Sequence, residues 1–365
     1  MVEEKELPRQ NAGSQARTSD SRLGDYLGSI LPYLLSGMIA LAAVGILLAL
    51  AGKDPFSGYA ILFQASFGSG VSLQLLLLEF IPLFLMALAF TVPLVAGKYN
   101  VGNEGQFLAG AMASAVIALA LPSLQPAAAL TVEVFAAILA GAAWAAIPAF
   151  MLYRFRVNEI VSTISMNFIA IYLVLYIATG SLRDPEVGFP QTRQISSAFI
   201  LPSLPGLTDV NIGILLAIIL PLLVYFFTFK TSSGFELRVT GANARAGRIF
   251  GVKTDLLSSL SLIAGGGIAG LAGGIQVSGL LHSLQYGMQS NYAALSYIVA
   301  LIGQGNLVAV VIASVFISAL EVGISAMQGA LGVPGDLGLI VEALLLLLIL
   351  IANVYRERVK RWLSQ

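Results

Sequence analysis

Long, continuous apolar runs recur along most of this 365-residue chain. About 20 apolar residues in a helix cross the hydrocarbon core of a bilayer. Nine such runs lie near residues 30–52, 74–96, 107–121, 131–152, 158–180, 211–229, 257–281, 307–328 and 335–354, and a shorter one covers 292–302. Because the runs are continuous rather than alternating, a membrane β-barrel is excluded. The sequence predicts an all-α, polytopic membrane helical bundle with nine or ten transmembrane segments.

The amino-acid composition excludes several classes of function. Only 10% of the residues are charged and the net charge is zero, whereas soluble domains carry about 25% charged residues. We therefore expect no nucleic-acid partner. The chain has no cysteine and one histidine, His282, which excludes thiol catalysis and metal sites built from cysteines or several histidines. No phosphate-binding G-x-x-x-x-G-K-[ST] motif occurs, and we expect neither a metal nor a cofactor in this chain.

Basic residues set the expected orientation. Four Lys or Arg residues lie in 1–29, two in 154–156, five in 230–256 and four in 355–365, which makes fifteen of the 19. Lys and Arg are enriched in cytoplasmic loops. We therefore predict that both termini and the 230–256 loop are cytoplasmic, which requires an even number of crossings, ten. Residues 30–354 form the transmembrane domain, 1–29 and 355–365 are cytoplasmic tails, and 181–208 is an external loop.

A polar motif precedes the run at 107–121, in residues 97–106 (GKYNVGNEGQ). That run has about 15 residues and spans only about 22 Å as a helix, so it cannot cross unless the motif enters the membrane. Polar backbone at membrane depth is tolerated where it is buried or lines a wet cavity. We assign Asn103, Glu104 and Gln106 to a solute pathway, with a plain cytoplasmic turn as the alternative.

Other polar residues lie within the runs. Asn167, midway along 158–180, is the fourth candidate pathway residue. Glu79, Glu321 and Glu342 either face the interior or an outward cavity, or reach the outer headgroups, because a charge facing lipid is costly. His282 fits an interfacial residue better than a ligand contact.

Glycines mark one helix contact. Residues 265–270 (GGGIAG) fit the dinucleotide pattern G-x-G-x-x-G, but they lie inside an apolar run rather than after a strand. Gly266, Gly270 and Gly274 recur every four residues and favour close helix packing.

The 230–256 loop contains a short amphipathic pattern. A short helix starting at Gly241 or Asn243 places Arg245 and Arg248 on one face, at i and i+3. This segment is either a docking element for a cytoplasmic partner or a positively charged anchor on lipid headgroups.

Four motifs together resemble a known family. Residues 99–106 (YNVGNEGQ) resemble the FNIGAEGQ motif in permease subunits of bacterial ABC importers for nucleosides and related simple sugars. Residues 156–167 (RVNEIVSTISMN) are similar to that family's GVNEVITTLMLN segment, 237–252 (LRVTGANARAGRIFGV) to its LRAVGENPRAARYAGI loop, and 266–274 to its SGALAGLAG helix. The likeness covers about residues 30–354, in the family's order.

Three departures from the family pattern are visible. Asn103 and Gly247 stand where the family has alanine, and residues 290–298 keep only loosely its GFDGIAVALLG segment. Because the Phe-Asp pair of that segment is missing, the resemblance does not identify the exact solute.

The resemblance implies a non-enzymatic permease subunit of the bacterial inner membrane that forms the pathway for nucleosides or simple sugars. ATP hydrolysis in a separate cytoplasmic subunit drives it, and a second homologous permease and an extracytoplasmic substrate-binding lipoprotein complete the importer. The residues expected to couple to the ATPase are Glu236, Arg238, Gly241, Asn243, Arg245 and Arg248. Alternatives are a permease for riboflavin or branched-chain amino acids, an ion-coupled secondary transporter acting alone, and an intramembrane enzyme.

Overall fold

Three closely packed helices form the centre of the protein: α4 (Asn103–Ala120), α5 (Pro126–Phe155) and α9 (Thr254–Gln276). Glycines permit this contact. A side chain at Gly110 would collide with the backbone of Gly270, and one at Gly141 with the backbone of Gly266 and Gly270. Close backbone approach strengthens packing between membrane helices, where lipid gives no hydrophobic driving force.

A computed structural model describes residues 35, 37–334, 338–341, 343–344, 347–348 and 351, without the side chains of 208–209. The predicted tails 1–29 and 355–365 lie outside the described residues, as do Glu342 and much of the predicted span 335–354.

A second group of helices packs along α3 (Gly70–Val95), which is buried almost continuously from Phe80 to Pro93. It consists of α2 (Pro55–Phe67), α10 (Tyr292–Gly303) and α11 (Leu307–Leu331). A further helix at Gly37–Leu50 packs against α2, where the Tyr59 hydroxyl donates to the Leu41 carbonyl at 2.6 Å. The sequence analysis did not predict α2. Its 13 residues are too few to form a run long enough to cross a bilayer.

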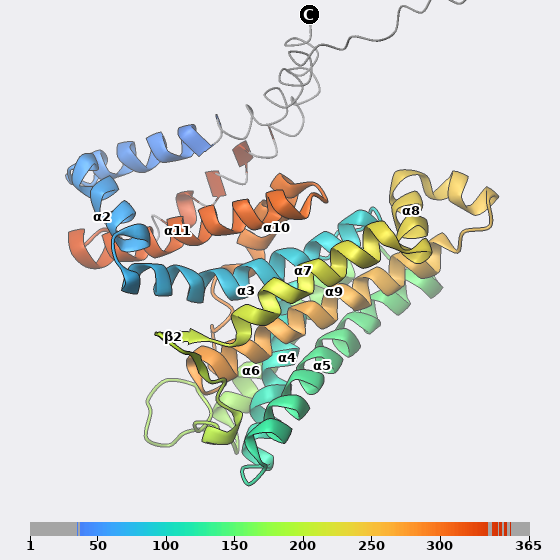
Figure 1. The fold of residues 1–365 in the computed structure, drawn as a ribbon, viewed down its shortest axis with the longest axis horizontal. Coiled ribbons are helices and arrows are strands. Elements are labelled where there is room, and N and C mark those ends of the chain that lie inside the picture. The colour runs from blue at the N-terminus through green and yellow to red at the C-terminus, as the bar shows by residue number, and fades with distance from the viewer. Residues whose placement is uncertain are drawn as a thin grey trace, which may run out of the picture.

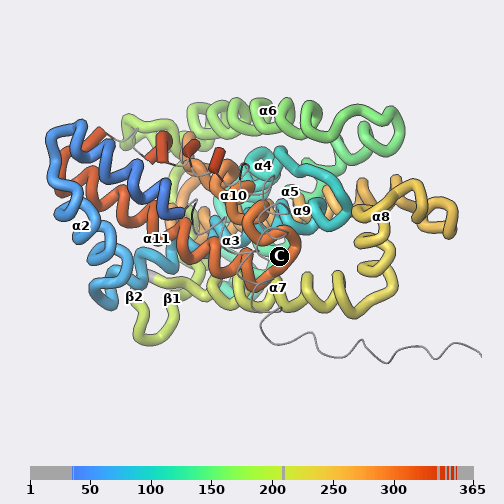
Figure 2. Tube along the Cα trace, turned by 90° about the horizontal axis from the view of Figure 1, so that it is seen from above, coloured from blue at the N-terminus to red at the C-terminus, as the bar shows by residue number. Residues whose placement is uncertain are grey.

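Two long helices flank the bundle. α6 (Glu159–Thr179) and α7 (Gly213–Lys230) lie along opposite edges when the protein is viewed from above (Figure 2). Both expose large apolar side chains, among them Tyr172 on α6 and Leu222 on α7. An apolar outer face is what a membrane helix presents to lipid.

The two ends of the bundle differ. One end carries α8 (Ser232–Ile249), and the other carries η1 (Ser197–Phe199) with the antiparallel strands β1 (Ser203–Leu204) and β2 (Leu207–Asn211) (Figure 1). We call them the α8 end and the hairpin end. At the hairpin end, the main chain of Thr192, Ile195 and Leu201 bonds to Leu284, His282 and Ser278, just beyond α9. There α9 continues into a π-helical turn, η2 (Val277–Leu281).

The predicted all-helical membrane bundle is confirmed, with one short strand pair added. Among the described residues, six helices are long and apolar enough to cross a membrane: Gly70–Val95, Pro126–Phe155, Glu159–Thr179, Gly213–Lys230, Thr254–Leu281 and Leu307–Leu331. The helix that contains the 107–121 run begins four residues before the run, because residues 103–106 of the polar motif form the first turn of α4. Residues 230–256 are mostly helix α8 rather than a loop. The count of ten crossings stays a prediction.

Candidate functional site

The site is built around the start of α4. Its N-cap, Gly102, has no side chain to accept hydrogen bonds from the first turn, although the first four N–H groups of a helix need partners. Asn167 on α6 supplies one from a distance: its Oδ1 accepts from the Gly105 N–H at 2.9 Å. The Asn167 side chain of α6 thus caps the N-terminus of α4.

The turn before α4 is also held in place, by side chains of α6 and α10. Asn167 Nδ2 donates to the Val101 carbonyl at 2.9 Å, and the hydroxyl of Tyr297 on α10 donates to the same carbonyl at 2.8 Å. A side chain at Gly102 would collide with Thr163 of α6. The irregular backbone is therefore enclosed by α6 and α10, an arrangement that polar backbone would need if it lay at membrane depth.

A reciprocal amide pair closes the motif. Asn100 Nδ2 donates to Gln106 Oε1 at 2.8 Å, and Gln106 Nε2 donates to Asn100 Oδ1 at 2.9 Å. Both side chains are buried. Both polar atoms of the Gln106 side chain are therefore bonded to the turn that precedes α4.

Asn103 and Glu104 point to different surroundings. Asn103 is fully buried, and its Nδ2 donates to the Ser296 hydroxyl at 2.9 Å, while its Oδ1 has no partner among the described residues. Glu104 is half-buried, and the side chain of Gln289 lies near its carboxyl group. The structure brings the four predicted pathway residues together, and among them Glu104 keeps the greatest exposure.

A second polar cluster lies beside the first. The Tyr292 hydroxyl donates to Glu79 Oε2 on α3 at 3.2 Å, and Gln276 and Glu321 also interact with Tyr292. Of the three carboxylates that the sequence singled out, Glu79 therefore bonds to a tyrosine of α10 and Glu321 lies in the same neighbourhood.

Sequence reasoning missed the role of α10. Its polar residues Tyr292, Ser296 and Tyr297 join the two clusters, since Tyr292 belongs to one and the other two to the start of α4. Three polar residues at i, i+4 and i+5 in a short apolar run were the available signal.

At the α8 end, several predicted coupling residues shape α8 itself. Asn243 has non-helical angles (φ −161°, ψ 91°) that kink the helix, and its Oδ1 accepts from the Ala246 N–H at 3.0 Å, so it caps a second helical segment. Gly241 packs against the Val95 carbonyl and Gly97, where a side chain would collide.

The cationic side chains of α8 are not equivalent. Arg248 Nη2 lies 2.8 Å from Asp255 Oδ1, and its Nε donates to Thr254 Oγ1 at 2.9 Å. Arg238 lies over the Phe229 ring, at 5.1 Å from its centroid. Glu236 and Arg245 are exposed, as are the apolar side chains Ile249 and Phe250 at the tip.

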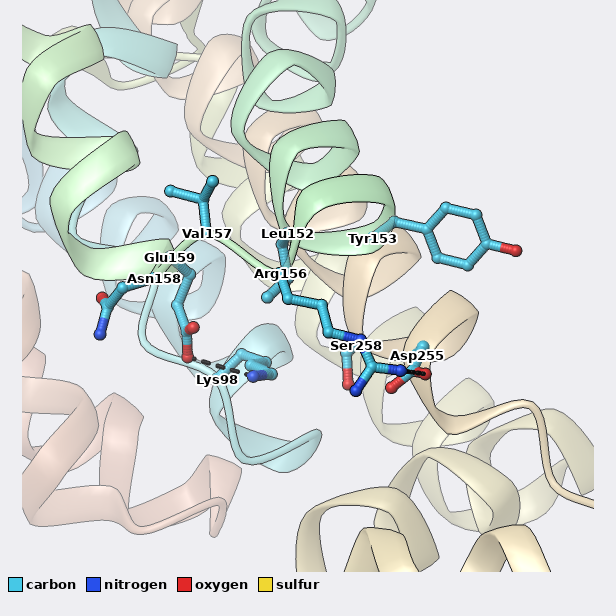
Figure 3. Close-up of a pocket in the computed structure, with 9 residues that line it drawn as sticks. All are labelled: Lys98, Leu152, Tyr153, Arg156, Val157, Asn158, Glu159, Asp255 and Ser258. Carbon is cyan, nitrogen blue, oxygen red and sulfur yellow. Dashed lines mark ion pairs between the residues drawn. The ribbon is translucent and has the colours of Figure 1, made fainter.

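A cavity of about 360 Å³ opens at the same end (Figure 3). Its lining residues are Lys98, Leu152, Tyr153, Arg156, Val157, Asn158, Glu159, Asp255 and Ser258. Two ion pairs border it, Lys98–Glu159 at 3.3 Å and Arg156–Asp255 at 3.8 Å. Because Asp255 also pairs with Arg248, the network links α8 to the α5–α6 turn. The described residues include no group of three or more His, Cys, Asp or Glu side chains that could hold a metal ion.

Comparison with known proteins decides the family. The model of the family described as branched-chain amino acid transport system / permease component matches residues 72–350. The chain belongs to this permease family. The resemblance seen in its sequence motifs is thereby confirmed.

Named relatives cover most of the permease. It is 32% identical to a glucose ABC transporter permease protein of Haloferax volcanii, over 89% of this chain and 88% of that protein. It is 29% identical to a guanosine ABC transporter permease protein of Bacillus subtilis, over 88% of this chain and 93% of that protein. A second guanosine permease protein of Bacillus subtilis is also 29% identical, over 54% of this chain and 64% of that protein. No solved structure matches the chain.

The family defines the part that this permease plays. It is the multi-pass membrane subunit of an ABC importer in the cell membrane, a transport subunit without catalytic activity of its own. An ABC permease works with an ATPase.

Proposed function

We propose that this permease imports a nucleoside or a related simple sugar along a route that passes the start of α4. The observation that carries the proposal is the pattern of relatives along nearly the whole chain, whose names specify glucose and guanosine. Both solutes are uncharged and rich in hydroxyl groups.

The chemistry at the start of α4 suits such a solute. Asn100, Asn103, Gln106 and Asn167 are uncharged and mostly paired with protein groups, so they hold the backbone in place. Glu104 is half-buried, and one carboxylate offers up to four acceptor sites. A single strong acceptor on a rigid support binds a hydroxyl without preventing its release.

Uptake by cells that express the complete importer tests the solute class. We expect ATP-dependent accumulation of labelled guanosine or glucose in preference to riboflavin and leucine. Accumulation of leucine or riboflavin alone would replace the nucleoside–sugar assignment by that solute. Proton-coupled uptake by this chain without an ATPase would instead make it a secondary transporter.

We infer that the α8 end faces the cytoplasm. Five Lys or Arg residues lie in 230–256, and the α8 end also bears Lys98, Arg154 and Arg156. The positive-inside rule favours that side. Ten crossings then place residues 1–29, 230–256 and 355–365 inside and 181–208 outside, with 30–354 as the membrane domain. Reporter fusions within 231–240 and within 185–189 should read as internal and external, and the reverse result would invert the orientation.

We also propose that α8 docks on the ATPase. Arg245, Ile249 and Phe250 present one exposed cation and two exposed apolar side chains at its tip, a combination suited to a partner surface. Charge reversal at Arg245 should reduce co-purification of the ATPase. If co-purification and uptake both persist, α8 is a lipid anchor.

The remaining partners follow from the importer's organisation. Bacillus subtilis has two guanosine permease proteins that both match this chain, which favours a second, homologous permease as its membrane partner. An extracytoplasmic substrate-binding lipoprotein would deliver the solute at the hairpin end. Co-purification from membranes tests each partner. Isolation of the chain as a lone functional transporter would contradict the second permease, the lipoprotein and the ATPase as required partners.

A further inference from the structure

One buried acid of α5 has no hydrogen-bond partner among the residues that the structure describes. Glu133 is 2% exposed, and neither of its carboxyl oxygens has a hydrogen-bond partner among the described residues. The hydroxyl of Ser114 on α4 is likewise buried and unpartnered. Because buried polar atoms are almost always paired, an unpaired group calls for an explanation such as a bound ion, water or proton.

These orphaned atoms converge at one place near the hairpin end. Ser114 and Ser278 lie beside the Glu133 carboxyl, but neither carboxyl oxygen makes a hydrogen bond of acceptable geometry with a described residue. Ser114 also faces Gly274 of α9, next to Ala137, one turn along α5 from Glu133. The acid therefore lies where α4, α5 and the π-helical turn η2 meet.

No Lys, Arg or His in the described part of the chain forms an ion pair with this carboxyl. The ion pairs among the described residues are Lys98–Glu159 and those that Asp255 makes with Arg156 and Arg248, all at the α8 end. The polar side chains beside the Glu133 carboxyl include those of Ser114 and Ser278. The ionisable residues on the helices packed against α5, together with the histidine that follows η2, are Glu104, Asp255, Glu159, Tyr172, Tyr176 and His282.

The count of donors and acceptors decides the state of the acid. The Ser278 hydroxyl already donates its proton to the Gly274 carbonyl at 2.9 Å, so Ser278 can only accept. If Glu133 were ionised, Ser114 would be its one available donor, and a negative charge would remain buried among apolar helices at a large cost. If Glu133 carries a proton, its O–H donates to Ser278 and its C=O accepts from Ser114. Every atom then has a partner after a small movement.

We propose that Glu133, Ser114 and Ser278 form a proton-binding site in the membrane domain, occupied while α4, α5 and η2 are packed together. The bound proton neutralises the acid and completes a chain of hydrogen bonds from Ser114 to Gly274. Separation of these three elements would admit water and release the proton. The site does not depend on which solute is carried.

Infrared spectroscopy of the full chain in membranes tests the proposal. The wild type should show the carbonyl stretch of a protonated carboxylic acid, and Glu133→Gln, which keeps the shape and the neutral state, should lose it. Ser278→Ala removes the acceptor of the acid proton and should shift this band rather than abolish it. Ser165→Ala, whose hydroxyl bonds only to its own helix, should leave it in place.

Two results would overturn the proposal. If Glu133→Gln removes a carboxylate band and leaves the acid region unchanged, Glu133 is ionised. If sodium chloride, relative to choline chloride at equal ionic strength, raises the melting temperature of the wild type but not of Glu133→Gln, the occupant is a metal cation. Should Glu133→Gln fail to accumulate, the Ser278→Ala shift decides alone, and an unshifted acid band would contradict the proposal.

Discussion

Gly241 of α8 packs directly against the carbonyl of Val95, the last residue of α3. The same contact brings Gly241 against Gly97, the first residue of the polar motif that leads into α4. Six residues later the chain reaches Asn103, and Asn100 and Gln106 brace the segment between. If the ATPase docks on α8 as proposed, a displacement of α8 has a short connection through the backbone to the start of α4.

Substitution of Gly241 tests this connection. A valine side chain would overlap the Val95 carbonyl, and such overpacking costs about 1–3 kcal/mol. We expect Gly241→Val to insert into the membrane and bind the ATPase, but to lose most solute-stimulated ATP hydrolysis and uptake. Gly329→Ala is the matched control, because no atom lies within 4 Å of a side chain added there. Normal coupling in Gly241→Val would show that α8 acts through another contact.

Asn167 is predicted to be a structural clamp. Asn167→Ala would leave the Gly105 N–H without its partner, and an unsatisfied buried group costs about 1–3 kcal/mol. The Val101 carbonyl would lose one of its two donors and keep the Tyr297 hydroxyl. We expect a clearly lower melting temperature in detergent, with reduced uptake as a consequence. The control is Ser165→Ala on the same helix. An unchanged melting temperature in Asn167→Ala would contradict the clamp and return Asn167 to the pathway.

Glu104 is predicted to affect transport rather than stability. Glu104→Gln keeps the size of the side chain but weakens the acceptor, and hydrogen bonds to charged groups exceed neutral ones by about 1 kcal/mol, roughly fivefold in affinity. Solute uptake should therefore change severalfold while the melting temperature stays near that of the wild type. Glu186→Gln, at an exposed position of the segment 181–208, should change neither quantity. Equal behaviour of the two variants would remove Glu104 from the pathway.

Arg248 and Arg245 should differ in a charge-swap experiment. Arg248→Glu would lose its ion pair with Asp255, and the additional change Asp255→Arg should restore that pair and part of the coupling. Arg245 makes no ion pair among the described residues, so Asp255→Arg should not rescue Arg245→Glu. The ATPase activity of the reconstituted importer measures coupling in each single variant and in each double variant. Rescue of Arg245→Glu would show that the arginines act only through the net charge of this end.

The long apolar runs were enough to predict the helical bundle, because a continuous run has few other solutions in a membrane. They did not reveal α2, which is too short, or the helical state of residues 232–242, whose pattern is polar. They also could not show that Asn167 caps α4, because that bond joins residues 62 positions apart. Glu133 escaped notice since it lies at the edge of the predicted run 131–152, and its isolation is visible only once α4 and η2 surround it.

Cysteine accessibility at position 104 tests the central claim most directly, because the chain has no other cysteine. In the assembled importer, we expect Glu104→Cys to react with a small polar thiol reagent at a rate that changes on addition of solute and again on addition of ATP. Glu186→Cys should react at a constant rate. If Glu104→Cys reacts uniformly under all conditions, or is reached from the cytoplasm alone and is indifferent to solute and ATP, the start of α4 is a plain turn and the translocation route lies elsewhere.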